Sequence, residues 1–241
     1  MAAPSEGNSH RSLNIFVNKM VKLNIDGQQY NLQGELTIDQ WKSIARWNLE
    51  DFKQWPKVIQ TVTALDLDTI NQMDLEQQRL AVTMIAWSMQ QREPIKLPPL
   101  DELNFGQFID IEYYIAMGPQ KSIDSIMRVL DIETYKSAEA LYAFEMYSKW
   151  RQNIYQRYTA LFGGEGTDQD DDGPKQSPEQ IAKSWYRILV DLANGDLLKV
   201  DGITEEGVKK VFNFMAVQKE RNLEELKRAK AKQYELQRSR R

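Results

Sequence analysis

One segment of the sequence places acidic side chains at the spacing of a calcium-binding EF-hand loop. Asp168, Asp170 and Asp172 stand at the first, third and fifth positions of such a loop, and Glu179 stands at the twelfth. Gly173 occupies the sixth position, where an EF-hand needs glycine for a sharp turn. Carboxylate oxygens are ligands that Ca²⁺ prefers. The spacing therefore indicates a calcium site formed by Asp168, Asp170, Asp172 and Glu179.

The residues around this loop favour a different interpretation. An EF-hand needs a helix that leads directly into its first ligand, but residues 163–167 read GGEGT and are expected to end such a helix. Ser177, followed by a proline, predicts the start of the next helix, so Glu179 falls in a first helical turn, where the helix dipole favours a carboxylate. We therefore interpret residues 163–176 as a flexible acidic linker and keep a calcium-responsive module as an alternative.

Other catalytic patterns are missing from the sequence. The chain has no cysteine, and its single histidine, His10, lies in a polar leader. No glycine motif for binding phosphate and no nucleophile elbow is present. Asp110 and Glu112 are only two residues apart, so they do not share a face of a helix. These observations predict a protein that is not an enzyme and needs no cofactor.

The C-terminal segment is strongly basic. Residues 219–241 contain nine Lys and Arg and four Glu, which gives 9 − 4 = +5. The segment has high helix propensity and few apolar positions, so we expect a charged helical tail. A basic helix can contact nucleic acid, but this one carries four acids and only one aromatic residue, so we favour a protein partner and keep nucleic acid as an alternative. The candidate partner-binding residues are Lys227, Arg228, Lys230, Lys232 and Arg238.

The composition of the whole chain is that of an ordinary globular protein. It has 241 residues, of which 41% are hydrophobic, and a net charge of −4. No apolar run approaches the about 20 residues that span a bilayer, so no membrane partner is expected. The acidic linker and the basic tail can pair electrostatically, within one chain or between copies, and this admits a homo-oligomer.

The rest of the sequence predicts a mainly α fold with one N-terminal β-hairpin. Apolar and polar residues alternate on both sides of Asp26-Gly27, which is a strong hairpin signal. Helical periodicity follows, with capping boxes predicted at Thr37 and Ser177, a helix end at Gly195, and helix starts at Ser122 and Thr204. The helix expected over residues 74–91 carries Leu80, Met84, Trp87 and Met89 as apolar residues. An aromatic stripe over residues 138–162 predicts core packing through Leu141, Phe144, Tyr147, Trp150, Ile154, Tyr158 and Leu161.

These elements predict five segments along the chain. Breaks in composition, glycine and proline set their limits. The expected order is a disordered leader (residues 1–20), a hairpin plus helical domain (21–162), the acidic linker (163–176), a small helical block (177–218) and the charged tail (219–241).

Three stretches resemble a set of tailed-bacteriophage virion-assembly proteins. Residues 22–59, KLNIDGQQYNLQGELTIDQWKSIARWNLEDFKQWPKVI, are similar to the hairpin and first helices with which those proteins begin. LNFGQFIDIEYYI (103–115) is similar to a later helix, and WYRILVDLANGDLLKVDGI (185–203) with FNFMAVQKE (212–220) is similar to their C-terminal block.

The resemblance implies a protein of phage tail or virion assembly. Its members are expected to act either as tail-assembly chaperones or as small structural parts of the tail, baseplate or connector. The partners implied are other tail or virion proteins, including a tape-measure-like helical protein. The implied location is the host cytoplasm during assembly, and the virion for a structural part.

Overall fold

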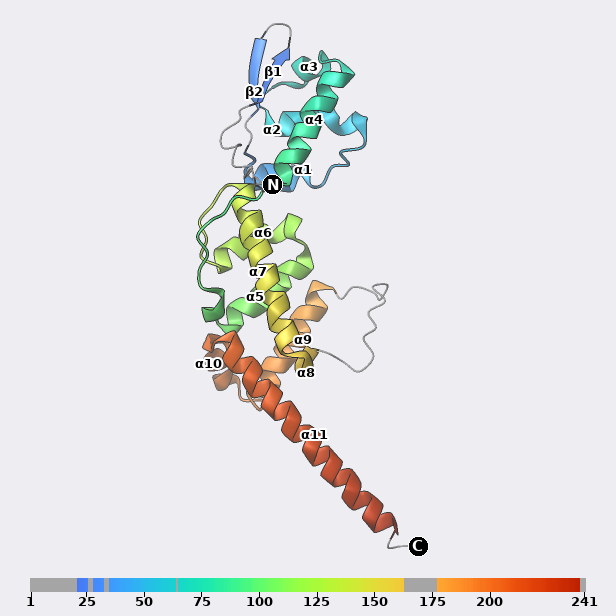
Figure 1. Cartoon of the computed structure of the whole chain (residues 1–241), viewed down its shortest axis with the longest axis vertical. Helices are drawn as coiled ribbons and strands as arrows, with labels where there is room; N and C mark the ends of the chain where they lie inside the picture. The colour runs from blue at the N-terminus through green and yellow to red at the C-terminus, as the bar shows by residue number, and fades with distance from the viewer. Residues whose placement is uncertain (1–20, 26–27, 33–34, 64, 163–176, 239–241) are drawn as a thin grey trace, which may run out of the picture. The chain divides into compact units, whose positions relative to one another are not determined.

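The chain folds mainly as α-helices in two compact units (Figure 1). This computed structural model describes residues 21–25, 28–32, 35–63, 65–162 and 177–238. Unit 1 comprises Met1–Leu36 and Trp47–Met89, and unit 2 comprises Thr37–Arg46 and Gln90–Arg241. The predicted leader, the Asp26-Gly27 turn and the acidic linker lie outside the described residues.

Unit 1 contains two strands and three α-helices among its described residues. The strands pair antiparallel in a register that sets Val21 opposite Leu32 and Leu23 opposite Tyr30. The elements are β1 (Val21–Ile25), β2 (Gln28–Leu32), the 3₁₀ turn η1 (Phe52–Gln54), α2 (Trp55–Val62), α3 (Leu67–Asn71) and α4 (Leu75–Met89).

The core of unit 1 forms where α2 packs against α3 and α4. Ile59 of α2 and Ile70 of α3 are fully buried, and α4 contributes Val82 and Ile85. The predicted apolar residues of α4 do not form this face, because Leu80 is 54% exposed. Two sides of α4 carry apolar side chains, so periodicity alone did not identify the side that α2 covers.

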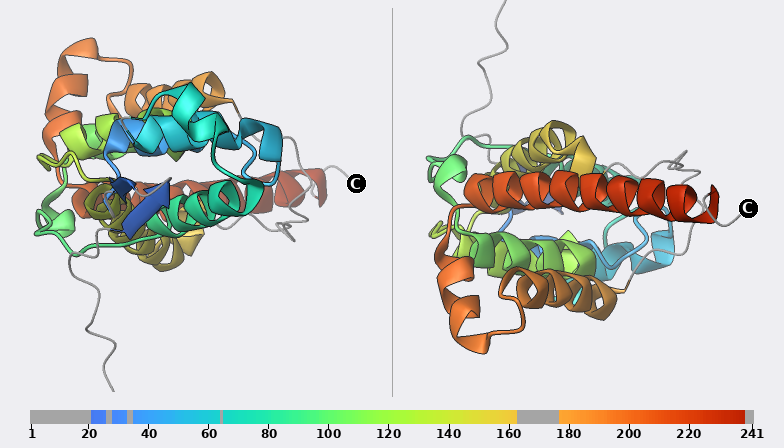
Figure 2. Two further views of the ribbon diagram at one scale, coloured as in Figure 1. Left: turned by 90° about the horizontal axis from the view of Figure 1, so that it is seen from above. Right: turned by 90° about the horizontal axis from the view of Figure 1, so that it is seen from below.

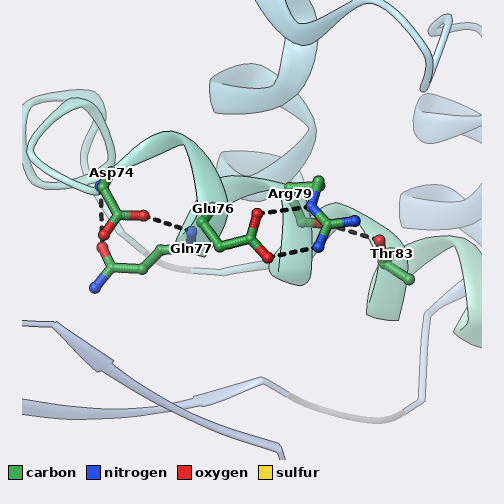
Figure 3. A network of polar contacts seen from close by, with 5 residues as sticks. All are labelled: Asp74, Glu76, Gln77, Arg79 and Thr83. Atoms are coloured by element: carbon green, nitrogen blue, oxygen red, sulfur yellow. Dashed lines mark hydrogen bonds and ion pairs between the residues drawn. The ribbon is translucent and has the colours of Figure 1, made fainter.

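The N-terminus of α4 is held by short-range polar contacts (Figure 3). Asp74 accepts a hydrogen bond from the Gln77 amide at 2.7 Å, and the Gln77 side chain accepts one from the Asp74 amide at 3.0 Å. This reciprocal pair has the form of a capping box. In the same first turn, Glu76 forms an exposed ion pair with Arg79, and the hydrogen bond that Arg79 donates lowers the pKa of Glu76. The Thr83 hydroxyl donates to the Arg79 carbonyl at 2.8 Å, so the network starts α4 rather than forming the core.

Unit 2 is helical and is organised around α5. Helix α5 packs against α6, α9, α10 and α11, and α6 packs against α1 and α7. The elements are α1 (Ile38–Ile44), the 3₁₀ turn η2 (Leu100–Glu102), α5 (Phe105–Met117), α6 (Pro119–Val129), α7 (Ser137–Arg157), α8 (Thr159–Phe162), α9 (Pro178–Leu192), the 3₁₀ turn η3 (Leu197–Lys199), α10 (Val200–Glu205) and α11 (Val208–Arg238).

The helix ends of unit 2 confirm several predictions and correct two. Capping boxes form at Thr37 and Ser177, and α9 ends at Leu192, with Gly195 shortly after it in the left-handed region at φ 75°. The prediction that Ser122 opens a helix is wrong, because α6 already begins at Pro119. Thr204 does not cap the last helix either, because it lies inside α10 and donates its hydroxyl hydrogen bond to the Asp201 carbonyl.

The structure divides the chain at different places from those predicted. The small helical block predicted over residues 177–218 is not separate, because α9, α10 and the first turns of α11 pack against α5 within unit 2. Residues 47–89 belong to unit 1, whereas α1 before them belongs to unit 2. The composition break at residues 163–176 therefore separates helices that share one core.

Candidate protein interface

An aromatic cluster joins α9 and α11 to α5. The rings of Trp185 and Phe212 each lie 5.4 Å from the ring of Phe108 and 5.8 Å from the ring of Phe105. All four side chains are buried, and all four of these ring contacts are edge-to-face, a geometry that aromatic pairs prefer. The first turns of α11 are therefore fixed in the core of unit 2.

Polar contacts fix the same turns from outside the cluster. Lys209 forms an ion pair with Asp101 at 2.6 Å, and the Trp150 indole donates a hydrogen bond to the other oxygen of Asp101 at 2.8 Å. The Tyr158 hydroxyl donates to the Asn213 side chain at 2.8 Å. Helix α11 is thus tied to both η2 and the end of α7.

The backbone before α11 pairs with the backbone before α5. The Phe105 amide donates to the Glu206 carbonyl at 2.8 Å, and the Val208 amide donates to the Leu103 carbonyl at 3.1 Å. Gly106 lies at this crossing, where an added Cβ would stand only 3.2 Å from the Cβ of Thr204. A glycine in this turn of α5 lets α10 approach closely.

The second half of α11 contrasts with the first. Val208, Val211 and Phe212 are buried, whereas every residue from Val217 to Gln233 is exposed. Figure 2 shows α11 as one unbroken helix across both parts. We call residues 217–238 the distal arm. This arm is a charged helix that begins on a rigid base, in agreement with the charged C-terminal helix expected from the sequence.

The five predicted partner-binding residues all lie in the distal arm but do not share one face. At about 100° per residue, Lys230 and Arg228 fall about 160° apart around the helix. Arg228 also pairs with Glu224 at 3.5 Å. The structure therefore brings Lys227, Arg228, Lys230, Lys232 and Arg238 onto one helix without forming a single basic patch.

Only one of the four candidate calcium ligands lies among the described residues. Asp168, Asp170 and Asp172 lie outside them. Glu179 stands in the first turn of α9, where a hydrogen bond with Ser177 lowers its pKa. No group of three or more His, Cys, Asp or Glu side chains that could hold a metal ion occurs in the described part of the chain.

A buried polar cluster between α5 and α7 was missed by the sequence analysis. Glu112 is 5% exposed and accepts hydrogen bonds from Arg151 and from the Tyr155 hydroxyl, the latter at 2.8 Å. Burial opposes the charge on Arg151, but its hydrogen bonds to Glu112 outweigh this effect and raise the pKa of Arg151 above its ordinary value. Burial, and then the charge of Glu112, raises the pKa of Tyr155. The hydrogen bonds of this cluster hold α5 and α7 together.

Neither similar proteins nor, among the described residues, a membrane-spanning helix supplies a further indication of what this chain binds. Comparison with protein-family models, with curated proteins and with solved structures finds no match for this chain. In the ranges that the structure describes, no helix is both long enough and apolar enough to cross a membrane.

Proposed function

We propose that this protein is a non-catalytic interaction protein of tailed-phage tail or virion assembly, with a chaperone-like role. The observation that supports it best is the distal arm, in which every residue from Val217 to Gln233 is exposed although the same helix begins in a buried aromatic core. A rigid base with an uncovered helix suits binding to a groove or helix of another protein. The resemblance of residues 22–59, 103–115, 185–203 and 212–220 to phage virion-assembly proteins supplies the biological setting.

In the chaperone role, the protein would keep an aggregation-prone tail protein soluble in the host cytoplasm until assembly. A tape-measure-like helical protein is the client that the resemblance implies. The alternative role is a structural component of the tail, baseplate or connector, in which the same arm stays bound to a neighbour in the virion. Both roles need the exposed arm, and they differ in where the protein ends up.

Quantitative mass spectrometry of purified particles and of infected-cell lysate separates these roles. A protein that is abundant in lysate and missing from particles supports the chaperone role. A fixed copy number in particles supports the structural role. A protein found in neither fraction of a phage infection would contradict the proposal, and the assembly setting would have to be abandoned.

A further inference from the structure

The distal arm carries a second feature, which lies on the same line as the buried face of α11. Val208 and Leu226 are 226 − 208 = 18 residues apart, which is five turns of about 3.6 residues. Leu226 therefore continues the side of the helix that Val208 buries in unit 2. Leu223 lies about 60° from this line on one side and Ala229 about 60° on the other. Leu223 is 49% exposed and Leu226 is 57% exposed.

The charges around this line are all of one sign. Lys219 and Lys230 lie within about 40° of it. The four glutamates of the arm all lie about 100° or more away, and they are Glu220, Glu224, Glu225 and Glu235. We call Lys219, Leu223, Leu226, Ala229 and Lys230 the apolar-basic face. Such a face fits a surface that is both apolar and acidic.

Unit 2 itself presents a surface of that kind. Leu197 is 72% exposed and Leu198 is 90% exposed in the short turn η3, which Asp196 caps by accepting a hydrogen bond from the Leu198 amide at 3.1 Å. Residues 191–206 contain five acids and one lysine, which gives 1 − 5 = −4. Asp191, Asp201 and Glu205 are exposed. We call residues 191–206 the leucine corner.

The charge of the whole chain is divided in the same way, with a basic C-terminal segment and an acidic remainder. The chain carries −4 and residues 219–241 carry +5, so residues 1–218 carry −4 − 5 = −9. Copies of this protein therefore attract one another when the arm of one meets the corner of another, and two arms repel where Lys219 or Lys230 of each copy meet.

An arm cannot reach the corner of its own chain while α11 stays helical. Leu226 lies about 27 Å along the helix from Val208, at about 1.5 Å per residue. Within unit 2, α10 lies beside the first turns of α11, and the rest of α11 runs away from it (Figure 1). An arm that docks on the corner must therefore belong to another molecule.

We infer that the apolar-basic face of one copy docks on the leucine corner of a second copy. Leu223 and Leu226 cover Leu197 and Leu198, while Lys219 and Lys230 lie against the acids of the corner. Each copy has one apolar-basic face and one leucine corner, so a pair joined by one contact still has a free surface of each kind. Association therefore extends beyond a pair, unless each arm of the pair docks on the corner of the other copy. This inference concerns the purified protein alone and does not depend on the phage setting.

Sedimentation velocity of the full chain tests the inference. We expect the average mass to rise with concentration up to about 200 µM at about 50 mM NaCl, and to fall towards the monomer at about 500 mM NaCl because salt screens the charges. The variant Lys219→Glu/Lys230→Glu should associate at least about tenfold more weakly, because it sets like charges against the corner.

The control variant Arg221→Glu/Lys232→Glu changes the net charge by the same amount on the opposite side of the arm. It should associate like the wild type, and circular dichroism should show the same helix content for all variants. An equal loss in this control would overturn the inference, because the effect would then follow net charge rather than the face.

A mixing experiment tests the pairing itself. The corner variant Asp201→Lys/Glu205→Lys should be as weak alone as the variant Lys219→Glu/Lys230→Glu, and mixing the two should restore association, since an acidic arm then meets a basic corner. A mixture that stays monomeric overturns the inference. So does a wild type that is monomeric at about 200 µM and low salt. If such a monomer binds a DNA duplex through its arm, the ligand of the apolar-basic face is the phosphate backbone and not a second copy of this chain.

Discussion

Arg151 of α7 donates two parallel hydrogen bonds to the carboxylate of Glu112 on α5, one of them 2.7 Å long, across 39 residues of sequence. The variant Arg151→Met leaves Glu112 buried without its cation. We expect this variant to lose about 3–5 kcal/mol of unfolding free energy, the cost of breaking a buried ion pair from one side. Urea unfolding followed by circular dichroism measures it.

The double variant Glu112→Gln/Arg151→Met is the control for this pair. It should lose less than the sum of the two single variants, because no charge is left buried. A loss below about 1 kcal/mol for Arg151→Met alone would mean that water reaches Glu112 and that the pair does not hold α5 to α7.

Gly106 and Gly202 make a matched pair of helical glycines. An added Cβ at Gly106 meets the Cβ of Thr204 at 3.2 Å, whereas at Gly202 nothing lies within 4 Å. We expect Gly202→Ala to raise the midpoint of thermal unfolding, because the higher helix propensity of alanine adds about 0.5–1 kcal/mol to the free energy of unfolding. Gly106→Ala should lower it, since overpacking costs about 1–3 kcal/mol. The same sign for both variants would show that α10 can move away from α5.

Trp185 anchors α9 in the aromatic cluster of unit 2. Trp185→Ala should cost about 3–5 kcal/mol, and amide exchange in α5 should become faster because the two helices share this core. Its neighbour Tyr186 is 57% exposed, so Tyr186→Ala should change the stability by less than about 0.5 kcal/mol. Unchanged exchange in α5 after Trp185→Ala would show that residues 177–218 fold as a separate block after all.

Asp101 gives the stability a defined pH dependence. Its hydrogen bonds from Lys209, and then from Trp150, hold the pKa of Asp101 below the ordinary 3.8. The contribution of the carboxylate is therefore complete above about pH 4 and is lost as the pH falls through the lowered pKa. Because this side chain is mostly exposed, we expect Asp101→Asn to cost only about 0.5 kcal/mol at pH 6 and less at pH 3. Urea titrations at both pH values measure the difference, and an equal loss at both would exclude the charge as its cause.

The distal arm should exchange its amide hydrogens faster than the first turns of α11. An isolated helix of this length is only marginally stable in water, whereas Val208–Met215 is held by the core. Hydrogen exchange on dilute monomer should show at least about tenfold lower protection after Val217 than before it. Uniform protection along α11 in a dilute sample would contradict this picture of an uncovered arm.

Local features of this fold were predictable from the sequence, because they depend on residues close together in the chain. The capping boxes at Thr37 and Ser177 each involve a glutamine three residues later, so a short window contains both partners. The aromatic stripe over residues 138–162 was predicted correctly as core in part. Leu141, Tyr147, Ile154 and Tyr158 are buried, whereas Phe144, Trp150 and Leu161 are only half-buried. Periodicity reports which residues avoid water when one face of a helix is apolar.

The pairing of distant segments was not predictable in the same way. No spacing rule connects Glu112 to Arg151, or Asp101 to Lys209, because these contacts arise only after the helices pack. The acidic segment suggested a domain boundary, yet Trp185 after it packs on Phe108 before it. In the arm, composition correctly predicted a charged helix. Composition does not give the direction in which each side chain leaves the helix, so the five predicted basic residues do not share one face.

The order of the two units along the chain has a consequence during protein synthesis. Helix α1 ends at Ile44, but its packing partners α6 and α7 are complete only at Arg157, which is 157 − 46 = 111 residues after the segment that contains α1. At about 5–20 residues per second, the ribosome needs roughly 6–20 s to make them. Trp41 and Ile44, which are almost fully buried in the finished fold, are bare on the nascent chain for that time. Helix α1 can therefore pack only after α6 and α7 have been synthesised, and by then residues 47–89 of unit 1 are already complete.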